Sequence, residues 1–214
     1  MHGLSNLLLL AVILLNFFVL GSSRLGACIR AVALQGAVLA LLPVAGHGLT
    51  GYALLLAGGA FVLKGMFIPW LLLRALREVR IRREVEPVVG YVPSLILGAG
   101  VTAGAFFLAG DLPLVAGHYD SLFIPTALAT LFSGFLLLIT RRKALTQVLG
   151  YLMLENGIFI FGILLSTAIP LLIEAGVLLD LLAAVFVMGI VIDQINREFS
   201  TVNTELLSAL KERP

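Results

Sequence analysis

The chain has 214 residues, of which 60% are hydrophobic and 12% are charged, with a formal net charge of +2 and a mean hydropathy of +1.11. A soluble domain typically has about a quarter of its residues charged, so this chain lacks the polar groups to cover a surface in water. The composition therefore excludes an ordinary soluble enzyme. Cys28 is the only cysteine, which excludes a disulfide framework and cysteine-ligated zinc or iron–sulfur sites within the chain.

Apolar segments recur along the whole length, and each is long enough to cross a hydrocarbon core of about 30 Å as a helix. The sequence predicts seven spans, at residues 4–20, 27–45, 52–73, 91–109, 122–139, 145–166 and 171–193. Backbone amides in lipid must be paired within each segment, so the predicted fold is an all-α integral membrane protein. We divide it into an N-terminal four-helix membrane region, a three-helix region and a tail, at residues 1–110, 111–194 and 195–214.

The positive charges assign an orientation to these spans. Every Lys and Arg except Lys64 lies in or beside the first, third or fifth connection, or in the C-terminal tail. The second, fourth and sixth connections contain none. Positive residues collect on the cytoplasmic side of membrane proteins, so we expect the N-terminus outside and the C-terminus in the cytoplasm. This strict alternation requires an odd number of spans.

Four ionisable residues fall inside the predicted spans: Lys64, Glu155, Glu174 and Asp180. A charged side chain at the bilayer centre costs about 2.5–3.5 kcal/mol on insertion scales. We therefore expect these groups to face protein or internal water, or to pair with one another. Lys64, Glu155 and Asp180 lie close to the middle of their spans, whereas Glu174 lies nearer the outer surface.

The sixth span carries a polar stripe. Gln147, Tyr151 and Glu155 are spaced by four residues and therefore line one helix face. The stripe would lead from the cytoplasm to the membrane centre, along which water could order, and Asn156 adds a neighbouring polar group. In the fourth span, the pair Gly100–Gly104 has the GxxxG spacing that indicates a close helix crossing.

The buried charges allow three interpretations. In a proton relay, carboxylates and a lysine at one depth on separate helices exchange protons. In a structural ion pair, Lys64 binds Glu155 or Asp180 only to fix the helix assembly. In a transporter, the charges bind a substrate or coupling ion, and inverted repeats with two discontinuous helices are expected, but the sequence shows no paired internal similarity. Pro69, shortly after Lys64, is expected to kink the third span, and broken helices near midplane charges are common in proteins that move ions.

The segment GYLMLENG at residues 150–157, with an acidic residue near the centre of the last span, resembles the three-helix K subunit of respiratory complex I and its relatives in Mrp-type antiporters. The resemblance implies that the last three spans share the fold of that subunit. It also implies that Glu155 corresponds to the middle-helix glutamate of the hydrophilic axis that carries protons. For the second relay carboxylate, Asp180 matches with an offset of one residue, and Glu174 is the alternative.

The N-terminal spans, with LKGMFIPW at residues 63–70, extend the resemblance to the hydrogenase-4 component E family over essentially the whole chain. This implies a proton-conducting subunit of a complex I-like assembly, such as a group 4 membrane-bound nickel–iron hydrogenase or a formate hydrogenlyase, in a bacterial or archaeal cytoplasmic membrane. The implied relay residues are Glu155, Lys64, Asp180 or Glu174, Tyr151 and Gln147.

The implied partners are an antiporter-like membrane subunit, peripheral hydrogenase-like and iron–sulfur subunits, and membrane lipids, with no nucleic acid. The subunit itself would hold no cofactor, no metal and no catalytic centre. Two alternatives remain open, namely a structural membrane anchor for a peripheral redox arm and a component of an Mrp-type cation/proton antiporter.

Overall fold

The computed structural model describes residues 2–47, 51–78, 87–111, 122–165 and 189. These residues form α1 (His2–Gly21), α2 (Leu25–His47), α3 (Gly51–Ala60), the π-helical segment η1 (Phe61–Phe67), α4 (Ile68–Glu78), α5 (Tyr91–Asp111), α6 (Phe123–Thr140) and α7 (Ala144–Leu165). Within them, six helices are long and apolar enough to cross a membrane, the third made of α3, η1 and α4 in succession. The first six predicted spans are thus confirmed as helices, while the seventh, at 171–193, lies outside the described residues.

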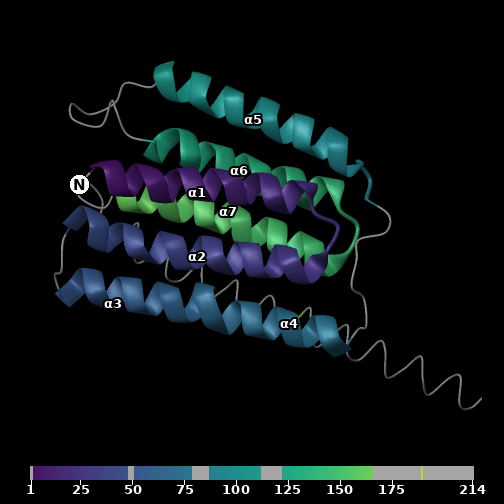
Figure 1. The fold of residues 1–214 in the computed structure, drawn as a ribbon, viewed down its shortest axis with the longest axis horizontal. Coiled ribbons are helices and arrows are strands. Elements are labelled where there is room, and N and C mark those ends of the chain that lie inside the picture. Colours follow the sequence, from purple (N-terminus) through teal and green to yellow (C-terminus); the bar gives the residue numbers. More distant parts are fainter. Residues whose placement is uncertain (1, 48–50, 79–86, 112–121, 166–188, 190–214) are drawn as a thin grey trace, which may run out of the picture.

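The helices lie side by side and alternate in direction, as Figure 1 shows. Helices α1, α2, α6 and α7 form the centre of the bundle, because α2 contacts both α1 and α7, and α6 contacts both α1 and α7. Helix α5 lies against α6 and α1, and the α3–η1–α4 span lies against α2. The centre of the bundle is therefore built from both ends of the described chain, so the predicted N-terminal and three-helix regions pack against each other.

One end of the bundle carries the described cations other than Lys64, and we call it the cationic end. The α1–α2 and α6–α7 connections and the end of α4 lie there (Figure 1). The described cations at this end are Arg24, Arg30, Arg74, Arg77, Arg141, Arg142 and Lys143. The alternation of charge predicted from sequence therefore corresponds to one physical end of the helix bundle.

Arg141 has a structural role that the count of charges does not reveal. Its side chain is 2% exposed, its Nη2 donates to Leu20 O at 2.8 Å and its Nη1 donates to Val89 O at 3.4 Å. The guanidinium also lies 4.6 Å from the ring centroid of Tyr91. Arg141 thus joins the end of α1 and the start of α5 to the α6–α7 turn, and at Leu20 it pairs one of the carbonyls that the C-terminal end of a helix leaves without a partner.

Two apolar clusters fill the bundle, one toward each end. The cluster at the cationic end includes Leu20, Ile29, Leu72, Leu137, Leu149 and Met153. The cluster at the opposite end includes Leu9, Val12, Leu39, Leu42, Ala127 and Ile160. On α1, α2, α6 and α7 the residues between the two clusters include buried polar side chains: Asn16, Gln35, Thr130, Ser133, Glu155 and Asn156. A polar layer therefore crosses the bundle between two apolar ones.

Candidate functional site

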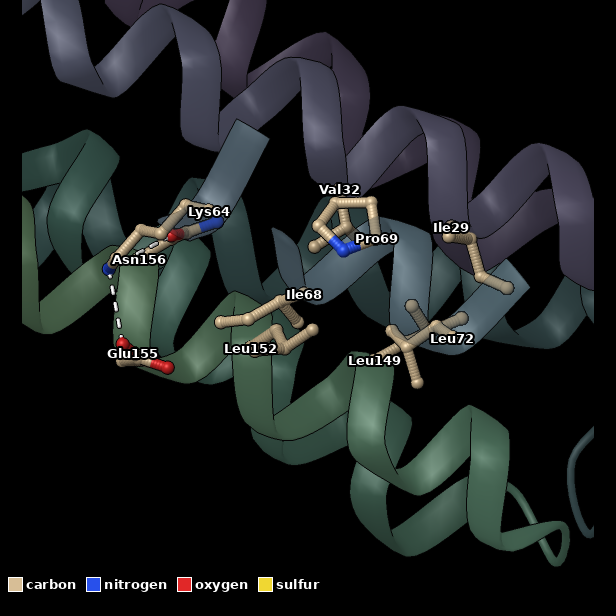
Figure 2. Close-up of a pocket in the computed structure, with 10 residues that line it drawn as sticks. All are labelled: Ile29, Val32, Lys64, Ile68, Pro69, Leu72, Leu149, Leu152, Glu155 and Asn156. Atoms are coloured by element: carbon tan, nitrogen blue, oxygen red, sulfur yellow. Dashed lines mark hydrogen bonds and ion pairs between the residues drawn. The ribbon is translucent and has the colours of Figure 1, made fainter. Parts of the chain in front are cut away.

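The centre of the polar layer is an ion pair between Lys64 of η1 and Glu155 of α7. Lys64 Nζ lies 3.2 Å from Glu155 Oε1, and the two side chains are 5% and 2% exposed. Figure 2 shows the ammonium reaching from η1 toward the carboxylate on α7. Of the pairings that the sequence left open for Lys64, the structure contains the one with Glu155.

The backbone around Lys64 is a π-helix. The Ile68 N–H donates to Leu63 O, five residues earlier, where an α-helix would bond four residues earlier. Pro69 follows directly and has no N–H to continue the pattern of hydrogen bonds. The irregularity that Pro69 predicts therefore takes the form of a π-helical segment, and such segments occur frequently at functional sites.

A glycine on α2 lets η1 come close. A Cβ added at Gly36 would lie 2.7 Å from Lys64 Cβ and 3.3 Å from Lys64 O. Both atoms belong to or adjoin the backbone of η1, so they cannot rotate away from a larger side chain. Gly36 therefore determines how closely the lysine-bearing segment approaches the centre of the bundle.

The two charges differ in their hydrogen bonding. Lys64 Nζ donates to Asn156 Oδ1 at 3.4 Å and lies 4.8 Å from the ring centroid of Phe159, a cation–π contact. Both oxygens of Glu155 are buried, and neither accepts a hydrogen bond from a described residue, because the contact with Lys64 lacks the alignment of one. Within the described part of the chain, the carboxylate thus relies on Lys64 alone.

A small cavity opens beside the pair. It is lined by Ile29, Val32, Lys64, Ile68, Pro69, Leu72, Leu149, Leu152, Glu155 and Asn156. Its polar residues lie at one end and its apolar ones extend toward the cationic end (Figure 2). The cavity offers about 10 Å³ to the centres of water molecules, which is room for about one water. Glu155 is one of the lining residues, and its two carboxylate oxygens are themselves buried.

Four members of the polar layer were not predicted from sequence: Asn16, Gln35, Thr130 and Ser133. Asn156 Nδ2 donates to Gln35 Oε1 at 3.1 Å, Gln35 Nε2 donates to Asn16 Oδ1 at 2.7 Å, and Asn16 Nδ2 donates to Thr130 Oγ1 at 2.9 Å. The signal in the sequence was a single amide inside an apolar helix, in LLNFF and in ALQGA. The sequence interpretation covered ionisable groups and the polar residues beside Glu155, so these isolated amides were missed.

The remaining predicted site residues lie elsewhere. Gln147 is exposed, and its Nε2 donates to Arg141 O at 3.2 Å, back toward the start of α7. Tyr151 is partly buried against the apolar cluster of the cationic end. Glu174 and Asp180 lie outside the described residues. On α7 the cavity is lined by Leu149, Leu152 and Glu155 together with Asn156. Of the predicted stripe of Gln147, Tyr151 and Glu155, only Glu155 lines it.

Within the described residues, no three His, Cys, Asp or Glu side chains come together as metal ligands would. The fold and the site thus define a multi-pass helical membrane protein with a buried ion pair at mid-helix depth. No family model and no solved structure matches the chain.

Comparison with curated proteins gives the family. The chain is 32% identical over 204 residues to the uncharacterized protein Rv0085 of Mycobacterium tuberculosis, covering 94% of this chain and 93% of that protein. It is 28% identical over 160 residues to Hydrogenase-4 component E of Escherichia coli K12 and of Shigella flexneri, covering 74% of this chain and 73% of those proteins. The chain therefore belongs to the family of Rv0085 and is a distant homologue of Hydrogenase-4 component E.

Proposed function

We propose that this chain is a proton-conducting membrane subunit of a complex I-like oxidoreductase of the membrane-bound hydrogenase or formate hydrogenlyase type. Its membrane would be the bacterial or archaeal cytoplasmic membrane, with the cationic end in the cytoplasm. Homology to a protein named Hydrogenase-4 component E suggests membership of a hydrogenase complex. The complex would supply the redox reaction, while this chain would carry protons.

The observation that carries the proposal is the Lys64–Glu155 pair. Lys64 Nζ lies 3.2 Å from Glu155 Oε1, close enough for the ammonium to stabilise the ionised carboxylate directly. The pair therefore lets Glu155 release a proton and take one up again in a low-dielectric interior. An ionised Glu155 without that counter-charge would be far more costly to bury.

Glu155 would be the principal relay carboxylate, and Lys64 its charge partner. A water in the adjacent cavity would bring the proton, and the apolar lining toward the cationic end would keep the path dry until that water enters. In our proposal, Asp180 or Glu174 is the next carboxylate along the path. Tyr151 and Gln147 would border its cytoplasmic entrance.

The decisive experiment uses Glu155→Gln in the native complex, purified through a tag on this chain and reconstituted in liposomes. The substitution keeps the shape of the side chain but removes its ability to ionise. We expect the complex to assemble and to retain redox turnover, while proton uptake per electron falls by at least about tenfold, as for removal of one positioned proton carrier. Arg142→Gln is the matched control, since it removes an exposed charge from the same α6–α7 hairpin at its cationic end.

Full proton uptake by the Glu155→Gln complex would overturn the relay. It would leave the pair with a structural role, as in a membrane anchor for a peripheral arm. The identity of the complex is tested separately by copurification. The proposal expects an antiporter-like membrane subunit and hydrogenase-like and iron–sulfur subunits with the tagged chain, whereas an Mrp-type assembly would bring down only membrane subunits.

A further inference from the structure

Lys64 is the first donor in a chain of hydrogen bonds that crosses four helices. From η1 the chain passes to Asn156 on α7, to Gln35 on α2, to Asn16 on α1 and to Thr130 on α6. These side chains are at most 6% exposed. The four polar side chains beyond Lys64 are uncharged, so this row of hydrogen bonds cannot be explained as an extended set of ion pairs.

The donor-to-acceptor direction of this hydrogen-bond chain is determined by chemistry at two points. A lysine ammonium can only donate, so the Asn156 atom that faces it must be the carbonyl oxygen, and the amide nitrogen must then face Gln35. Gln35 Nε2 also donates to the backbone carbonyl of Val12 at 3.4 Å, and a carbonyl can only accept. Both points give the same direction, in which each side chain from Lys64 to Asn16 donates to the next one along the row.

Three amide dipoles therefore align with their oxygen ends toward the ammonium. Hydrogen-bonded amides in a row polarise one another, so the oxygen of Asn156 is a stronger acceptor than that of an isolated amide. Hydrogen bonds to the charged form of a group favour that form. Glu155 has no such support from the described residues, since neither of its oxygens accepts a hydrogen bond from them.

We propose that Asn156, Gln35, Asn16 and Thr130 are positioning residues that stabilise the positive charge of Lys64 independently of Glu155. Lys64 then stays protonated during turnover, and Glu155 is the group of the pair that gains and loses the proton. When a hydrated proton arrives, one O–H bond of its water carrier breaks and one O–H bond forms on Glu155, which cancels the charge of the carboxylate, while Asn156 still accepts a hydrogen bond from the ammonium. This inference rests on the proposed relay, but it can fail while the relay stands.

The test is the protonation state of Glu155 in the full chain, purified in lipid nanodiscs and measured by infrared spectroscopy at neutral pH. A protonated carboxyl gives a C=O band that a carboxylate lacks, and the band is assigned to Glu155 by its absence when Glu155→Gln is added to the same variant. We expect no such band in the native chain. In Asn156→Leu the ratio of protonated to ionised Glu155 should rise by about tenfold, as for loss of a hydrogen bond to a charged group.

Two threonines on α6 provide a matched pair of mild variants. Thr126 and Thr130 are both 0% exposed, but Thr130 ends the hydrogen-bond chain, whereas the hydroxyl of Thr126 has no hydrogen-bond partner among the described residues. Thr130→Val should produce a weaker Glu155 band than Gln35→Leu, Thr130→Ser should abolish it again, and Thr126→Val should give none. Thr130→Val and Thr126→Val each replace one buried hydroxyl by a methyl group of similar size, so they keep the test usable if a larger change prevents folding.

A band of equal size in Thr126→Val and Thr130→Val would overturn the inference. So would a loss of proton uptake in Gln35→Leu with Glu155 still ionised, since the amides would then act only in helix packing. Neither result depends on the proton uptake of the Glu155→Gln complex, whose retention would instead overturn the relay.

Discussion

The two faces of α7 can be compared within one helix. Toward α6 the backbones touch, because a Cβ added at Gly134 would lie 2.5 Å from Leu154 N and one added at Gly157 would lie 2.7 Å from Leu131 N. Toward η1 the helix presents Glu155, Asn156 and the wall of a cavity. The α6-facing side of α7 is packed backbone against backbone, whereas the η1-facing side carries the charged Glu155 beside a cavity.

The difference indicates where the site can respond to a change of charge. Close glycine packing gives α7 many short contacts with α6, so a shift of the whole helix would lose them all. On the other face, the Lys64 side chain is long and the cavity has room for about one water. Movements coupled to protonation should therefore be rotations of the Lys64 side chain and exchange of water, with α7 kept in place.

The largest effect should come from Lys64→Met, which leaves the Glu155 carboxylate buried without its partner. Breaking a buried ion pair from one side typically costs about 3–5 kcal/mol. We expect a large fall in the thermal unfolding temperature of the full chain in detergent. The double variant Lys64→Met/Glu155→Leu should recover most of that loss, since neither charge of this pair is then left behind. A double variant less stable than the single one would mean that Lys64 stabilises the fold chiefly through other contacts.

The glycine face should give the next largest effect. Gly134→Ala places a methyl group against the backbone of α7, which cannot rotate away. Overpacking of this kind typically costs about 1–3 kcal/mol. The measurement is again thermal unfolding in detergent, and the proton uptake of molecules that do fold should be normal. Normal stability would show that α6 and α7 separate more easily than their contact suggests.

Gly36→Ala tests the polar face without changing any polar atom. The added Cβ would push on Lys64 Cβ, so we expect proton uptake by the complex to fall severalfold and unfolding free energy to fall by about 1 kcal/mol. Gly26→Ala is the control on the same helix, because its Cβ would lie 3.5 Å from Leu76 Cδ2, an ordinary contact. Equal effects from the two variants would contradict the role of Gly36 at the site.

The smallest effect should come from Gly100→Ala on α5. An added Cβ there meets no atom of the described residues, so stability in detergent should change by less than about 0.5 kcal/mol. The close crossing that the GxxxG spacing predicts is thus not present among the described helices. A marked loss of stability in the isolated chain would show that this glycine packs after all.

The sequence-based predictions succeeded where misplacing a single residue in lipid would cost a large free energy. Charge and hydropathy located the six described helices, because an unpaired backbone amide or an exposed charge in lipid is too costly to be misplaced. Lys64 and Glu155 were singled out for the same reason. Arg141 was interpreted only as one more cytoplasmic charge, although its buried bonds to two carbonyls differ from those of its exposed neighbour Arg142.

The predictions were incomplete where the energy depends on several helices at once. Asn16, Gln35 and Thr130 are ordinary residues in their own segments, and they meet only because α1, α2 and α6 are rotated to place them in one layer. The GxxxG spacing of Gly100–Gly104 drew attention to glycines whose added Cβ would meet no described atom. Gly36 and Gly134 have no glycine four residues away, yet they lie close to a neighbouring helix.

The sequence by itself determined that this chain has helices apolar enough to span a membrane, that its described positive residues other than Lys64 gather at one end of the bundle, and that Lys64 and Glu155 are buried. Each of these follows from the cost of placing one group in lipid, which a single residue and its neighbours reveal. Only the tertiary structure decided that Lys64 meets Glu155, that η1 is a π-helix, and that a directed row of amides reaches the ammonium. These features depend on the rotation and separation of helices, which are determined by contacts among residues far apart in the chain.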